Sequence, residues 1–318
     1  MTGSLEADDR AIRTGAVLAR PAHELVWVEG DDAATFLEGL LSQRVDSAPI
    51  GSVRRSLLLS PQGKLVSPLW ILRGAGRIGL VADAGSGQAV IDTLGRFRIR
   101  VDAAVEREPG STCEVWGPAA ADVVAAATGI EPSRGAWTHD GGTMTAHLPF
   151  RHTDLPRWLI VGIEPSTLVA AGAVEVDEEA VAAVRIEAGE PRMGVDVHPS
   201  TIPQEADLVV DAVDFSKGCY LGQELVARID SRGRVNRHLR GLCGVQDVVP
   251  PVGATLLVEG QEVGMLTSVA RSSRLGVPVG LGLVRREVAP GAAVALRWDG
   301  GSAAAVVTEL PLVAVGNG

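Results

Sequence analysis

The sequence predicts an α+β fold, in which a mixed α/β body is followed by a small β-barrel or sandwich. Two observations support this. Through the first two thirds of the 318 residues, strand-like apolar stretches alternate with stretches of helical periodicity. After about Leu239 only short strand-like runs remain, divided by turn residues at Gly260, Pro290-Gly291 and Asp299-Gly300-Gly301.

Domain organisation follows from this change and from the length, since a domain averages about 150 residues. We expect an α+β body at residues 15–235, with a possible second lobe at about 109–177, and a β-barrel domain at 236–318.

Five segments of the body carry the local signals. Glu24 to Val28 is strand-like, and residues 31–41 follow with acidic residues and then apolar residues at helical spacing. Residues 72–83 indicate a β-hairpin around Gly74 and Gly76. Arg96 to Val101 alternates arginine with apolar residues, which predicts a half-buried strand. Residues 177–189 predict a helix that begins with acidic residues and ends at a glycine.

The glycines at 74, 76 and 79 satisfy the GxGxxG pattern of dinucleotide-binding loops. That fingerprint requires a helix after the third glycine, whereas IGLVAD has the composition of a strand. We therefore interpret these glycines as part of a hairpin turn.

Composition restricts the function classes. Lys and Arg number 29 against 39 Asp and Glu, and this net charge of −10 opposes general binding to nucleic acid or to an anionic membrane. No run of about 18 apolar residues predicts a membrane span, and the N-terminus lacks the apolar core of a signal peptide. We expect a cytoplasmic protein.

Three cysteines, Cys113, Cys219 and Cys243, are widely spaced and form no CxxC pair. At least one is therefore unpaired, as suits a reducing compartment, and we expect no metal site. A free cysteine is usually a small buried apolar residue, and we interpret Cys113 and Cys243 in that way.

The segment DFSKGCYLGQELVAR, residues 214–228, favours a functional interpretation for Cys219. A lysine two residues earlier and a helix expected to begin near Gly222 would both stabilise a thiolate. Gly222 permits close approach of a ligand to the backbone, and Tyr220 offers an aromatic face to a flat heterocycle. Lys217 could instead be a solvated lysine ahead of a helix, and Gln223 and Glu224 could be ordinary residues of a first helical turn.

A basic run follows this segment in an otherwise acidic chain. It could hold the carboxylates of an anionic ligand or an acidic partner, or it could be a solvated linker surface. The run comprises Arg228, Arg232, Arg234, Arg237, His238 and Arg240.

KGCYLGQE, from Lys217 to Glu224, closely resembles the signature of the YgfZ family, a branch of the glycine-cleavage T protein-like superfamily. RIEAGEPRMGVDV (185–197), Pro203 to Glu205 and the segments VEGDDAATFLEGLLSQ and LLLSPQGKLVSPLW extend the resemblance over most of residues 24–310. The resemblance implies a ring of mixed α/β lobes around a central channel that binds tetrahydrofolate or a one-carbon derivative, followed by a C-terminal β-barrel.

The resemblance also implies site residues. Glu187 matches the acidic residue by which T proteins bind the pterin, a role that suits a carboxylate because it accepts two hydrogen bonds. Tyr220, Gly222, Gln223, Glu224 and Arg228 are the other expected folate-binding residues, and Cys219 with Lys217 the expected catalytic pair.

One departure from the T proteins concerns the reaction. Their paired aspartates after the hairpin glycine are replaced by Val66 and Ser67, and neither side chain ionises near neutrality. Glycine-cleavage aminomethyl transfer is therefore not expected.

We expect a folate-binding accessory protein for the assembly or repair of iron-sulfur clusters in client enzymes. The Cys219 thiolate would react with a folate-borne one-carbon unit or a cluster-derived sulfur. A folate-dependent one-carbon transferase or demethylase and a non-catalytic folate-sensing scaffold are the alternatives. We expect no direct nucleic-acid or membrane partner, and no intrinsic cluster, since one cysteine is too few to hold one.

Overall fold

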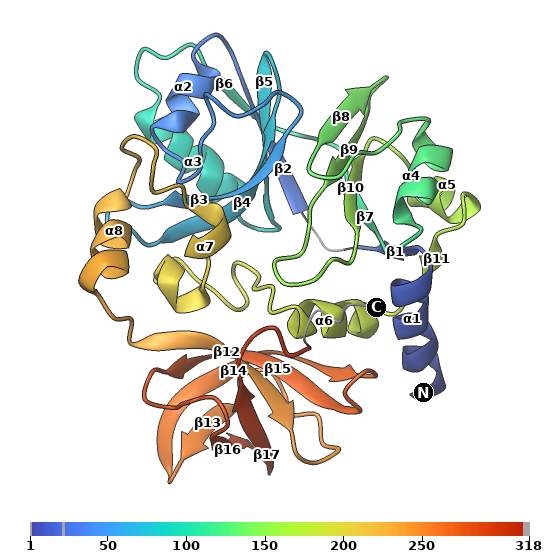
Figure 1. Cartoon of the computed structure of the whole chain (residues 1–318), viewed down its shortest axis with the longest axis vertical. Coiled ribbons are helices and arrows are strands. Elements are labelled where there is room, and N and C mark those ends of the chain that lie inside the picture. The colour runs from blue at the N-terminus through green and yellow to red at the C-terminus, as the bar shows by residue number, and fades with distance from the viewer. Residues whose placement is uncertain (1, 21–22, 314–318) are drawn as a thin grey trace.

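The computed structural model describes residues 2–20 and 23–313, which form two open sheets and a closed β-barrel (Figure 1). Each open sheet carries helices on its outer face, and the inner faces of the two sheets pack together. The helix at Glu178–Glu187 lies between the two sheets and the barrel. The expected mixed α/β lobes and C-terminal barrel are thus confirmed.

The first sheet has the strand order β3-β4-β5-β2-β6. Its strands are β2 (His23–Glu29), β3 (Val53–Leu59), β4 (Leu65–Arg73), β5 (Arg77–Asp83) and β6 (Ala104–Arg107). The predicted strand and hairpin correspond to β2 and β4–β5, and Gly79 lies within β5, which confirms the turn interpretation of the glycine pattern. Helices α2 (Ala33–Glu38) and α3 (Gly87–Phe97) cover the outer face through residues such as Leu37 and Val90.

The strand expected at Arg96 to Val101 is wrong. Residues 87–97 form α3, whose Val90 and Leu94 pack against the sheet, and the chain then leaves the helix without strand pairing until β6. Ile99 is 74% exposed, so the alternation of arginine and apolar residues does not reflect a buried face.

The second sheet has the order β11-β1-β7-β10-β9-β8. It comprises β1 (Val17–Ala19), β7 (Thr112–Trp116), β8 (Trp137–Asp140), β9 (Thr143–His147), β10 (Arg157–Val161) and β11 (Val174–Glu175). The N-terminal strand β1 lies between two strands from much later in the chain, with Val17 paired to Val174 on one side and to Trp116 on the other. Helices α4 (Ala120–Thr128) and α5 (Pro165–Ala170) cover the outer face.

Helix α6 (Glu178–Glu187) connects the sheets to the barrel, where it packs against β14, and α1 (Thr2–Thr14) packs beside it (Figure 1). Asp177 accepts a hydrogen bond from the Glu179 amide at the start of α6, and Gly189 adopts a φ of 67° just after its end. Both termini were predicted from these residues. A short 3-10 turn (Pro203–Ala206), α7 (Val209–Ala212) and α8 (Gln223–Arg232) then lead into the barrel.

The barrel closes in the order β12-β15-β14-β13-β16-β17. Its strands are β12 (Arg237–Gly244), β13 (Thr255–Val258), β14 (Gln261–Ser272), β15 (Val277–Arg285), β16 (Ala293–Trp298) and β17 (Gly301–Thr308). Gly260 and Gly300 occupy left-handed turn positions between strands, as the sequence predicted. No helix in the described part of the chain is long and apolar enough to cross a membrane.

Candidate functional site

Lys217 is a buried anchor, because its side chain is fully shielded from solvent. Its ammonium donates hydrogen bonds to the backbone carbonyls of Glu38 (2.7 Å), the last residue of α2, and of Leu41 (2.7 Å) and Gln43 (3.2 Å), just past the end of that helix. It also lies 3.3 Å from a carboxylate oxygen of Glu38. Burial lowers the pKa of Lys217, and the Glu38 carboxylate partly opposes this.

These contacts correct the expected role of Lys217. An ammonium has three donors, and backbone carbonyls accept all three, so none remains for a Cys219 thiolate. Lys217 instead satisfies carbonyls that the end of α2 leaves without helical partners. Together with the hydrogen bond from the Leu221 amide to the Gly39 carbonyl, 3.1 Å, it fixes the 214–222 loop to the first lobe.

Gly222 allows two backbone segments to meet. It has a φ of 79°, and a β-carbon there would lie 2.5 Å from the Ser60 carbonyl oxygen and 3.1 Å from the Gly63 α-carbon. A β-carbon on Gly63 would in turn lie 2.9 Å from the Gly222 carbonyl oxygen. The close approach predicted for Gly222 therefore exists, but the group that approaches the glycine is the backbone of the β3–β4 turn and not a ligand.

Tyr220 is a core residue, 6% exposed, in the same hydrophobic cluster as Leu57, Leu65 and Val226. Burial raises its pKa to about 12, and its hydroxyl has no hydrogen-bond partner among the described residues. The Lys217 ammonium lies 5.5 Å from the ring centroid. A buried ring leaves little surface for a ligand, and its contact with folate stays a prediction.

The remaining residues of the motif lie on or near the surface. Cys219 is exposed, and Glu224 and Arg228 are exposed one helical turn apart on α8. Gln223 begins α8, and its side-chain oxygen accepts a long hydrogen bond, 3.4 Å, from the Tyr220 amide. Cys113 is buried, as expected.

Glu187 ends α6 with its carboxylate almost fully buried. One oxygen accepts a hydrogen bond from the Ser272 hydroxyl at 2.6 Å, and the other accepts one from the Arg13 guanidinium, also at 2.6 Å. A carboxylate offers about four lone-pair directions, so roughly two remain free. The barrel and the N-terminal helix thus orient this carboxylate without using its full capacity.

Glu187 lines a pocket of about 380 Å³, referred to below as the Glu187 pocket. Its volume lies within the range of about 300–1,000 Å³ that is typical of small-molecule sites. Arg13 and Arg274 are the cationic groups on its wall, and one further acid is Asp154. His152 also lines the pocket, and burial lowers its pKa. None of residues 214–228 lines it, so the structure does not bring Glu187 and Cys219 into one pocket.

Val66 and Ser67 occupy β4, where the T proteins have aspartates. Val66 packs against the core of the first lobe, and the Ser67 hydroxyl is buried and donates to the Pro68 carbonyl at 2.7 Å. No ionisable side chain stands at these two positions.

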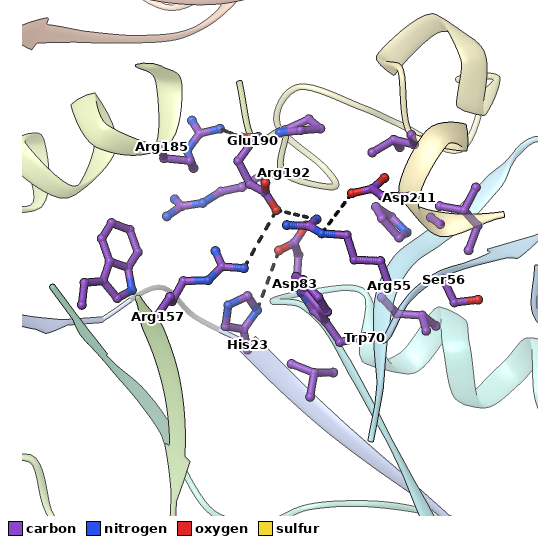
Figure 2. Close-up of a pocket in the computed structure, with 18 residues that line it drawn as sticks. His23, Arg55, Ser56, Trp70, Asp83, Arg157, Arg185, Glu190, Arg192 and Asp211 are labelled. Carbon is purple, nitrogen blue, oxygen red and sulfur yellow. Dashed lines mark hydrogen bonds and ion pairs between the residues drawn. The ribbon is translucent and has the colours of Figure 1, made fainter. Parts of the chain in front are cut away.

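A second, smaller cavity of about 50 Å³ lies between the two sheets and the 185–192 segment (Figure 2). Arg55 lies 2.7 Å from Glu190 and 3.2 Å from Asp211, while Arg157 approaches Glu190 at 3.9 Å. Despite its burial, Glu190 has a pKa lowered to about 2 by these arginines. The space between the lobes is therefore a cavity of about 50 Å³ that these charged side chains narrow. The central folate channel that the resemblance implied stays a prediction.

Sequence reasoning missed this buried ion cluster. Its members come from β3, β10, α7 and the loop after α6, and each resembles an ordinary surface charge in sequence. A signal existed only at Glu190, which directly follows the RIEAG segment. Among the residues described, no group of three or more His, Cys, Asp or Glu side chains could hold a metal ion.

Comparisons with known proteins agree with the fold described above. Residues 237–313 match the glycine cleavage T-protein C-terminal barrel domain. The whole fold is similar to aminomethyltransferase T of the glycine cleavage system from Bartonella henselae, with a TM-score of 0.86, 25% identity, and 97% of this chain and 89% of that one covered.

Sequence relatives include two proteins named tRNA-modifying protein YgfZ. The protein from Yersinia enterocolitica is 43% identical over 75 residues, 23% of each chain. The protein from Edwardsiella ictaluri is 27% identical over 233 residues, 70% of this chain and 69% of the relative. The fold and the barrel define a glycine-cleavage T protein-like protein. Within that class, this chain is similar to YgfZ proteins over the parts of its length given above.

Proposed function

We propose that this chain binds a reduced folate, tetrahydrofolate or a one-carbon derivative of it, in the Glu187 pocket. We further propose that it serves as an accessory protein for the assembly or repair of iron-sulfur clusters in client enzymes. The observation that carries the first proposal is the buried Glu187 carboxylate, which is oriented by Arg13 and Ser272 at the wall of a ligand-sized pocket.

The chemistry of the two partners is complementary. The aminopyrimidine edge of a pterin presents adjacent N–H donors, and the free lone pairs of the Glu187 carboxylate can accept them. Arg13 and Ser272 would hold that carboxylate in a fixed orientation. At the rim, the exposed Arg274 is suited to the carboxylates of the folate tail.

We propose that the Cys219 thiol reacts with a group on a partner protein. It is exposed and does not line the Glu187 pocket, so these positions support reaction with a group on a docked client over reaction with the bound folate. As a thiolate it could take the outer sulfur of a client persulfide, forming a Cys219 persulfide and releasing the client thiolate. Glu224 and Arg228, on the adjacent exposed face of α8, would contact the same partner.

Aminomethyl transfer is disfavoured although a solved structural relative is an aminomethyltransferase. The acid needed near the folate nitrogen has no counterpart, because Val66 and Ser67 stand in its place. For the YgfZ relatives' role in tRNA modification, we propose an indirect contribution through a client enzyme, since a net charge of −10 opposes general tRNA binding.

Anaerobic titration calorimetry with tetrahydrofolate tests the ligand. We expect saturable binding to the wild type and a loss of about 100-fold in Glu187→Ala, because two charge-assisted hydrogen bonds disappear. Glu178→Ala is the matched control: this exposed glutamate begins the same helix and does not line the pocket. Absence of binding to the wild type would refute the folate proposal.

A second assay isolates the thiol. Cys219→Ser should keep folate affinity but fail to restore client activity in a depleted extract, with Cys243→Ser as the control. Full client activity in Cys219→Ser would contradict the thiol chemistry and favour a non-catalytic scaffold.

A further inference from the structure

A groove of about 510 Å³, referred to below as the α6 groove, lies where the second sheet, α6 and the barrel meet. Its volume falls within the range of about 300–1,000 Å³ that is typical of ligand sites. It shares no lining residue with the Glu187 pocket, so it is a separate feature of the surface. Its lining includes Leu18 of β1, Glu175 of β11, Glu178 and Val181 of α6, Val249 of the β12–β13 loop and Ala270 of β14.

The inner wall of the α6 groove is apolar. Leu18, Val181 and Ala270 are buried side chains that border it. The apolar surface continues onto the β12–β13 loop, where four valines are between 42% and 62% exposed. Single exposed apolar side chains are ordinary, whereas several together mark an interaction site. The four are Val245, Val248, Val249 and Val252.

The start of α6 adds acidic charge that no cation neutralises. Glu178 and Glu179 are exposed and line the groove, and neither forms an ion pair within 4.0 Å with any residue that the structure describes. One oxygen of Glu179 accepts a hydrogen bond from the Arg271 amide at 3.3 Å, but the Arg271 guanidinium pairs with Asp247. Acids are common in a first helical turn, yet here they also border an apolar wall.

The two arginines that line the groove already have acidic neighbours. Arg20 pairs with Glu175 at 2.5 Å. Arg192 lies among the charged side chains between the lobes (Figure 2). Burial lowers its pKa, and the Asp83 and Asp196 carboxylates on that side oppose this. The groove therefore presents two uncompensated carboxylates beside apolar surface.

This combination selects one class of occupant. The apolar surface extends beyond the groove onto a loop, so a polypeptide segment covers it better than a small molecule does. Anionic lipids and nucleic acids would be repelled by the two carboxylates. A second copy of this chain carries the same net charge of −10 and would be repelled as well.

We propose that the α6 groove binds a segment of a partner protein in which lysine or arginine alternates with apolar residues. The apolar side chains lie against the inner wall and the loop valines, and the cations lie beside Glu178 and Glu179. The proposal is independent of folate binding and of Cys219, because it concerns different residues.

Calorimetric titration with three blocked pentapeptides tests the proposal. The probes are acetyl-Val-Lys-Leu-Lys-Val-amide, its counterpart with glutamate for both lysines, and its counterpart with serine for the three apolar residues. We expect the first to bind saturably with a Kd of about 1 mM or tighter, and the other two to bind about tenfold more weakly. Added salt should weaken the first, since exposed ion pairs are screened.

Glu178→Gln/Glu179→Gln should weaken binding of the first peptide about tenfold, because two exposed ion pairs are lost. Its glutamine at 179 can still accept the hydrogen bond from the Arg271 amide, and a retained unfolding midpoint would show that the fold is intact. Glu106→Gln/Glu131→Gln is the control: both acids are exposed, lie outside the groove and change the net charge equally.

Three results would overturn the proposal. The first is absence of saturable heat with the lysine peptide. The second is equally tight binding of the glutamate or the serine peptide, which would leave no role for the acids or for the apolar wall. The third is a Glu178→Gln/Glu179→Gln variant that binds as well as wild type.

Discussion

Replacing Lys217 with methionine removes the ammonium that joins the 214–222 loop to the end of α2. Three backbone carbonyls lose a charged donor at 2.7, 2.7 and 3.2 Å, and Glu38 loses an ion pair at 3.3 Å. A hydrogen bond to a charged group contributes about 1.5–3 kcal/mol, but contributions do not add, and water can reach the less buried carbonyls. Breaking a buried charged contact typically costs about 3–5 kcal/mol, which we take as the expected loss.

Urea unfolding followed by tryptophan fluorescence measures this loss as a change in the free energy of unfolding. Lys64→Met is a matched control, because Lys64 is the other lysine of the sequence and is exposed in the β3–β4 turn. We expect the control to change stability by less than about 0.5 kcal/mol. A loss below about 1 kcal/mol in Lys217→Met would refute the assignment of Lys217 as a structural anchor.

Three further outcomes follow from the structure. Gly222→Ala should lower the unfolding free energy by about 2 kcal/mol or more, because the added β-carbon would lie 2.5 Å from the Ser60 carbonyl oxygen and φ is positive. Gly218→Ala is the control and should be nearly neutral, because no atom lies within 4 Å of its added β-carbon. Equal effects of the two substitutions would contradict this packing. In the native protein a thiol reagent should modify Cys219 rapidly and Cys113 only on unfolding, since Cys113 is buried with its pKa raised to about 11; fast double modification would argue against this burial. Burial lowers the pKa of His147 to about 4, so its contribution to the unfolding free energy should be complete above about pH 6.5 and fall by about 3 kcal/mol as pH drops to 4. The unfolding free energies of wild type and His147→Gln, measured in urea, should therefore converge in acid. Parallel pH profiles of the two proteins would exclude this contribution.

Much of the fold was predictable because its signals are local. Apolar strand residues around Gly74 and Gly76 indicate the β4–β5 hairpin. Asp177 at its start and Gly189 after its end indicate α6. The error at Arg96 to Val101 has a local cause too. The end of an amphipathic helix and an exposed turn together produced a pattern of period two, and periodicity alone does not separate such cases.

The site was less predictable, because its residues act across long distances in the chain. Glu187 was singled out through its segment's resemblance to known proteins, yet Arg13 and Ser272, which orient it, lie 174 and 85 residues away. Lys217 and Tyr220 were expected to serve a ligand, and packing instead made one an anchor and the other part of the core.

The sequence by itself determined most of the strand and helix pattern, the all-β character of the C-terminal module and the absence of an aspartate at Val66 and Ser67, because these depend on residue type and local spacing. Only the tertiary structure decided which charges are buried and with what partners. The energy of a buried ion depends on the groups that surround it after folding, and for Lys217, Arg55 and Arg192 those groups come from distant elements.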